Sequence, residues 1–100
     1  MSTTTERRRH RQGALLVDVH ATCTSAPSSD YSIDVYYDAD GGGAGVLAET
    51  LTIEAGETFA FRSLDGQEMK PFQSEVWLVL PDGSRPAGLC VVVGFDRPTR

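Results

Sequence analysis

Residues 31–37 read Tyr-Ser-Ile-Asp-Val-Tyr-Tyr, in which apolar side chains recur at every second position. Because successive side chains of a β-strand point to opposite faces of a sheet, this pattern predicts a strand with one buried and one wetter face. A Ser/Pro/Asp loop precedes the segment, and a glycine-rich connection follows it at 38–45. The inward face of this strand is expected to carry Tyr31, Ile33, Val35 and Tyr37.

Working outward from this segment, the same alternation between turn residues predicts five more strands. The first covers 14–24 and directs Leu15, Val17 and Val19 inward, with Leu16 on the other face. Strands at 46–54 and 58–64 flank Ala55-Gly56, which predicts a hairpin. The last two strands are expected at 74–80 and 89–95. Six mainly antiparallel strands in a short chain predict an all-β fold, a small sandwich or barrel.

Length and charge divide the chain into a basic arm and an acidic body. The 100 residues suffice for one domain, which we place at 13–97 with a tail at 98–100. Residues 1–12 carry four arginines and one glutamate, a charge of +3, so the net charge of −5 leaves −8 on the rest. We expect this arm to be disordered, although Thr3 and Glu6 have capping-box spacing that permits a helical turn. Its contact residues for an acidic partner are Arg7, Arg8, Arg9 and Arg11.

An acidic body repels phosphate backbones, so nucleic acid is not expected as a partner except through the arm. The chain has no apolar run long enough for a signal-peptide core or a membrane span. These features predict a cytoplasmic protein, or a component of a particle assembled in the cytoplasm, without a membrane partner.

The two cysteines, Cys23 and Cys90, lie in the first and last predicted strands. In a reducing compartment they are expected as free thiols, and together with the two histidines they lack the paired spacing of a structural zinc site. A disulfide would be possible only if the two strands were neighbours with suitable Cβ geometry.

The chain carries no sequence motif of a hydrolase, nucleotide-binding or dinucleotide-binding enzyme. Asp18, His20 and Thr22 share one face of the first predicted strand. Same-face neighbours on one strand are about 7 Å apart, which exceeds the hydrogen-bond reach of a nucleophile and its base. We therefore expect a solvated sheet face there and no enzyme activity.

The glycine-rich connection at 38–45 suggests a calcium site. Asp38, Asp40, Gly43 and Glu49 occupy positions one, three, six and twelve of a 12-residue calcium loop. Against this, glycines stand at positions five and eight, and the flanking segments read as strands rather than helices. Calcium is thus a minor candidate at Asp38, Asp40 and Glu49, and no other cofactor is expected.

The two late strands are apolar without a gap, over 76–80 and 89–93, so both of their faces need cover. If no barrel corner or loop such as 65–72 supplies it, Trp77, Val79 and Val92 form an exposed apolar patch with Tyr36. Leu16 is expected near this patch.

Two functions follow from this patch. The first is a non-enzymatic β-sandwich module that self-associates as a homo-oligomer, or docks a larger protein assembly, through its second apolar sheet face. The alternative is a small ligand-binding module of carbohydrate type, which calcium could assist. In that case Trp77 or the tyrosines would stack on a sugar, and the 38–49 loop would hold the ion. Partner identity and strand order are left open by the sequence.

Overall fold

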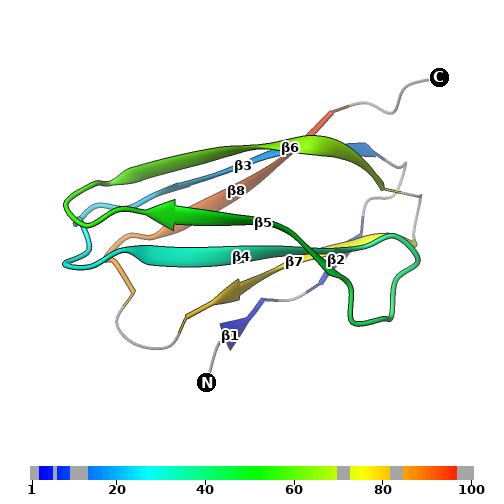
Figure 1. Cartoon of the computed structure of the whole chain (residues 1–100), viewed down its shortest axis with the longest axis horizontal. Helices are drawn as coiled ribbons and strands as arrows, with labels where there is room; N and C mark the ends of the chain where they lie inside the picture. Colours follow the sequence, from blue (N-terminus) through cyan, green and yellow to red (C-terminus); the bar gives the residue numbers. More distant parts are fainter. Residues whose placement is uncertain (1–2, 6, 10–13, 70–72, 82–84, 97–100) are drawn as a thin grey trace.

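The computed structural model describes residues 3–5, 7–9, 14–69, 73–81 and 85–96. These residues form antiparallel β-strands in two sheets that pack as a sandwich (Figure 1). Within these ranges no helix is long and apolar enough to cross a membrane. The predicted all-β architecture is confirmed, and of its two forms the sandwich is the one adopted.

Three long strands build each sheet. The first sheet has the order β7 (Glu75–Leu80), β4 (Tyr31–Asp38), β5 (Val46–Ile53), and two short strands, β1 (Thr3–Thr4) and β2 (Arg8–Arg9), pair with the outer side of β7. In the second sheet β3 (Ala14–Thr22) lies between β6 (Phe59–Met69) and β8 (Cys90–Asp96). All six long strands predicted from the sequence are present.

The core lies between the sheets and is built by the alternation that the sequence shows. Tyr31, Ile33, Val35 and Tyr37 of β4 all point inward and are buried, as predicted. Apolar side chains of β5 and β7 extend this layer, and β3 supplies the facing layer. The fully buried large side chains are Leu16, Val19, Ile33, Val35, Leu51 and Ile53.

A β-bulge in β3 changes the predicted phase of its first residues. The register shifts between Leu16 and Asp18 in both ladders that β3 makes. An extra residue in one strand moves the preceding side chains to the other face. Leu16 is therefore fully buried, whereas Leu15 and Val17, which were expected inward, are half-buried. Beyond the bulge β6 continues to pair with β3, so residues 65–69 belong to a strand and not to the predicted loop.

The prediction of a hairpin at Ala55-Gly56 is wrong, because the two strands that flank this turn do not pair with one another. The turn is present, with the Glu57 N–H donating to the Glu54 carbonyl at 2.9 Å and Gly56 at a φ of 84°. However, β5 pairs with β4 and β6 pairs with β3, so the turn carries the chain from one sheet to the other (Figure 1). Local turn chemistry is the same for a hairpin and for a crossing, and only the pairing partners distinguish them.

The first and last long strands, β3 and β8, are neighbours, with Thr22 opposite Cys90. Cys23 is buried and Cys90 is exposed, so the two thiols lie on opposite sides of the second sheet. Both cysteines are free. The two strands meet as a disulfide would require, but their side-chain directions do not allow one.

Six residues of the arm are described, and they are extended. Thr3 pairs with Leu80 and Arg8 with Val76, and the Thr5 N–H donates to the Leu78 carbonyl at 2.8 Å. The described part of the arm thus lies along the edge of β7 and forms no helical turn. Disorder of the arm as a whole stays a prediction.

Candidate protein-interaction face

Trp77 points away from the core, because its neighbours Val76 and Leu78 pack inward. Its exposed fraction is nevertheless only 5%. The Arg7 guanidinium carbon lies 3.8 Å from the centroid of the indole ring, and the Tyr36 ring stacks beside it with centroids 5.8 Å apart. A guanidinium over an indole is a cation–π contact and also covers the ring from water. The arm therefore covers the side chain that was expected to be exposed.

Glu75 joins the arm to the glycine-rich loop. Its Oε1 atom accepts from Arg7 Nη1 at 3.1 Å and from the Gly42 N–H at 2.7 Å. Glu75 is buried, and a buried carboxylate is stable only when it is paired and hydrogen-bonded. These contacts hold both the arm and the loop against the outward face of β7.

The loop at 38–45 closes over the same face. Asp38 accepts the Gly43 N–H at 2.6 Å and the Asp40 N–H at 3.2 Å. The hydrogen bond from Gly43, followed by those from Asp40 and Gly41, holds the pKa of Asp38 below its usual value. Gly45, at a φ of 72°, lies so close to Trp77 that a Cβ atom there would overlap the indole ring.

The structure does not bring the four predicted interface residues together. Tyr36 and Val79 lie half-buried beside Trp77 on the outer face of the first sheet, whereas Val92 lies on the outer face of the second sheet. Leu16, which was expected near the patch, is in the core. The expected exposed patch around Trp77 is absent, because the arm and the loop cover it.

A different apolar face is open to solvent, on the outside of the second sheet. Phe61, His20 and Val92 stand opposite one another across three strands, and Phe59, Thr22 and Cys90 form the adjacent row. Phe59, Phe61 and Val92 are 57%, 53% and 43% exposed. His20 stacks on Phe59 with ring centroids 6.3 Å apart. We call these six residues the Phe61 face.

The sequence analysis missed both phenylalanines of this face. The sequence places Phe59 and Phe61 in phase on one face of the strand expected at 58–64, without indicating which face is buried. In the structure β6 turns the intervening Ala60 inward, while the two rings point out. The available signal was the small residue between them, since an alanine at an inward position leaves the larger neighbours on the outer face.

No metal site is formed by the candidate acidic residues. The Asp38 carboxylate accepts backbone N–H groups, and Glu49 Oε1 accepts the Thr50 N–H at 3.0 Å. Among the described residues no three His, Cys, Asp or Glu side chains gather as metal ligands. The Asp18 side chain packs closely against Gly94 of β8. A Cβ atom added to Gly94 would overlap the Asp18 carboxylate.

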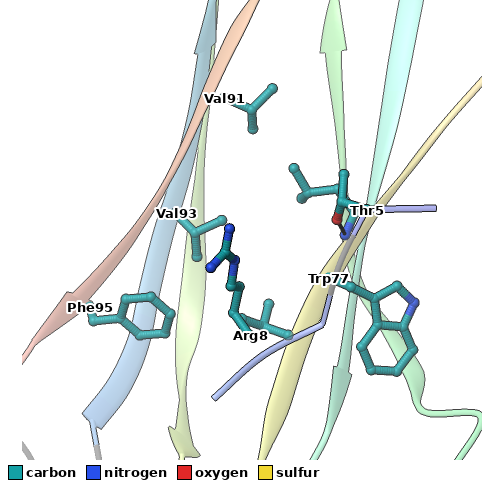
Figure 2. A pocket seen from close by; sticks show the side chains of 8 residues that line it. Thr5, Arg8, Trp77, Val91, Val93 and Phe95 are labelled. Atoms are coloured by element: carbon teal, nitrogen blue, oxygen red, sulfur yellow. Dashed lines mark hydrogen bonds between the residues drawn. The ribbon is translucent and has the colours of Figure 1, made fainter. Parts of the chain in front are cut away.

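A cavity of about 240 Å³ opens between β7, β8 and the arm. Figure 2 shows Arg8 reaching from the arm toward Val93 and Phe95, with Trp77 on the other side of β7. This placement separates the two arginines, because Arg7 covers the outer face while Arg8 faces the gap between the sheets. The cavity is lined by Thr5, Arg8, Val76, Trp77, Leu78, Val91, Val93 and Phe95.

Of the other predicted arm contacts, Arg9 belongs to β2 and Arg11 lies outside the described residues.

Comparison of this chain with protein-family models, with curated proteins and with solved structures found no match.

Proposed function

We propose that this protein is a non-enzymatic β-sandwich module that self-associates through the Phe61 face. The observation that carries the proposal is the register of Phe61, His20 and Val92 across three strands, which places exposed apolar side chains on both sides of His20. Contiguous exposed apolar surface on a small domain is typical of interaction sites, and aromatic side chains supply much of their binding energy.

The charge distribution limits where two copies can meet, and this face is a place where they can. Outside the arm the chain carries −8, so two bodies repel one another over most of their surfaces. None of the six residues of the Phe61 face is Asp, Glu, Lys or Arg. Two copies related by a twofold axis would bring this uncharged area against itself, and twofold pairing is the commonest symmetry of soluble oligomers.

The face is small, which sets the expected affinity. A stable interface uses about 20 residues or more on each side. Six residues are fewer, although neighbouring side chains would add to the contact. We therefore expect a dimer whose population rises with protein concentration.

The experiment is light scattering after size exclusion over a series of protein concentrations. We expect the native chain to shift toward twice the monomer mass as concentration rises, and Phe61→Asp to show a much smaller shift with an unchanged circular dichroism spectrum. The matched control is Leu47→Asp, which places the same charge at a similarly exposed position, 52%, on the first sheet. Leu47→Asp should dimerise like the native chain.

Two outcomes contradict the proposal. A native chain that is monomeric at every concentration excludes self-association and leaves docking to another protein as the use of the face. Equal loss of the dimer in Phe61→Asp and Leu47→Asp places the contact elsewhere.

The carbohydrate-binding alternative gains no support from the aromatic residues that suggested it. Tyr31, Tyr37 and Trp77 are buried, and Tyr36 is half-buried against Trp77. The Tyr31 hydroxyl lies in the interior without a hydrogen-bond partner among the described residues, and burial raises the pKa of this side chain. Stacking on a sugar requires an accessible ring face.

A further inference from the structure

We propose that the outer edge of β7 is an acceptor site for an extended, arginine-bearing segment, and that the arm of a second copy binds there in place of the chain's own arm. The inference concerns a different surface from the Phe61 face and does not rest on the function proposed above.

The first argument is the kind of contact that the arm makes. It adds to β7 as a strand: Thr4 lies opposite Val79, the Thr5 N–H donates to the Leu78 carbonyl, and the Leu78 N–H donates to the Thr5 hydroxyl, both at 2.8 Å. Strand addition to a sheet edge is a general mode of peptide recognition, because backbone hydrogen bonds supply affinity whichever molecule the strand belongs to.

The second argument is the specificity of the site. Arg7 lies on the Trp77 ring at 3.8 Å and pairs with the buried Glu75 carboxylate at 3.1 Å. The planar guanidinium satisfies both groups at once, which an ammonium group on a lysine does less well. A segment that fits this edge must therefore be extended and must carry an arginine opposite Trp77, and the arm of every copy meets both conditions.

The third argument is that few residues hold the arm, and that an exchanged arm restores each contact that the chain's own arm gives up. Its pairing consists of two strands of two residues each, separated by residues 5–7. The strand pairing and the Arg7 contacts join the arm to the first sheet, Arg8 also lines the cavity beside β8, and residues 10–13 connect the arm to β3 of the second sheet. Exchange of such an element between identical chains replaces each contact with its equivalent and requires only a new path for the connection. The arm charge of +3 also attracts it to the acidic body of any copy.

The test traps the exchanged arm as a disulfide. In a background of Cys23→Ala and Cys90→Ser, one chain carries Thr4→Cys and a second carries Val79→Cys. Thr4 and Val79 are directly opposed and flank the hydrogen-bonded pair of Thr5 and Leu78. They therefore form a non-hydrogen-bonded pair with Cα atoms about 4.5 Å apart, a separation that a disulfide can span.

The control mixture contains the same Thr4→Cys chain and a Thr52→Cys chain. Thr52 lies on β5, at the opposite edge of the first sheet from the arm. We expect covalent heterodimers to form about tenfold faster with Val79→Cys than with Thr52→Cys, because docking raises the effective concentration of the two thiols. Adding Arg7→Gln to the Thr4→Cys chain should remove most of this difference.

Equal rates for the two mixtures would overturn the proposal. A single chain that carries both Thr4→Cys and Val79→Cys provides a second measurement. If it yields cross-linked monomers and the two-chain mixture yields no excess heterodimer, the arm binds only to its own chain. If it yields no disulfide at all, the arm does not occupy the edge of β7 and the acceptor site falls with it.

Discussion

At the scale of single residues, Arg7 covers one side of Trp77. The guanidinium contributes a cation–π contact and a partly exposed ion pair to Glu75. Such contacts stabilise by about 0.5–1 kcal/mol each at accessible positions, and their sum is reduced by solvent screening of the exposed end. The larger effect is geometric, because one side chain covers the outer side of an indole ring.

Replacing Arg7 by Gln should expose that ring. We expect acrylamide to quench Trp77 fluorescence more strongly in Arg7→Gln than in the native chain, with a loss of stability of about 1 kcal/mol. The control is Arg62→Gln, which removes one positive charge from an exposed position on β6. If both variants show native quenching, Arg7 is not what covers Trp77.

At the scale of elements, the alternating pattern predicted which residues form strands but not which strands pair. Residues 31–37 behave as their pattern indicates, since the burial of Tyr31, Ile33, Val35 and Tyr37 depends only on strand geometry. The crossing between sheets at Ala55-Gly56 is not predictable from the sequence, because a four-residue turn carries no information about the sheet that its second strand joins. The burial of Trp77 is not predictable for a related reason, since Arg7 and Gly45, which cover it, come from segments far away in the chain.

The glycine-rich loop offers a matched test of how Trp77 is covered from its second side. Gly45 and Gly42 both have positive φ, 72° and 76°. A Cβ atom on Gly45 would overlap the Trp77 ring and approach the Tyr37 carbonyl at 2.9 Å, whereas one on Gly42 meets nothing within 4 Å.

Both substitutions by alanine should be destabilising, because a side chain is strained at positive φ. We expect about 1 kcal/mol for Gly42→Ala and about 2–3 kcal/mol for Gly45→Ala, measured by urea unfolding. A Gly45→Ala variant that unfolds at the same urea concentration as Gly42→Ala would show that the loop does not pack on Trp77.

At the scale of the whole molecule, charge acts in opposite directions on the two proposed contacts. The Phe61 face is uncharged but belongs to a chain of net charge −5, so copies that meet through it repel one another at long range. The arm joins the same body by attraction between opposite charges. Salt screens both effects, since the Debye length falls to about 10 Å at 0.1 M ionic strength.

We therefore expect added sodium chloride to strengthen dimers formed through the Phe61 face and to expose Trp77 by loosening the arm. Sedimentation equilibrium of the native chain and acrylamide quenching of Trp77 in Phe61→Asp, both over a salt series, separate the two effects. A dimer that weakens as salt is added would indicate a charged interface in place of the Phe61 face.

The position of the arm also bears on how the chain folds during synthesis. Arg7 and its partner Glu75 are 68 positions apart, so the arm leaves the ribosome well before the strand that it joins. Contacts between distant segments form late, because the intervening chain must be ordered first. Until β7 emerges, the arm has no sheet edge of its own to occupy, and a neighbouring nascent chain that has already exposed its β7 provides one.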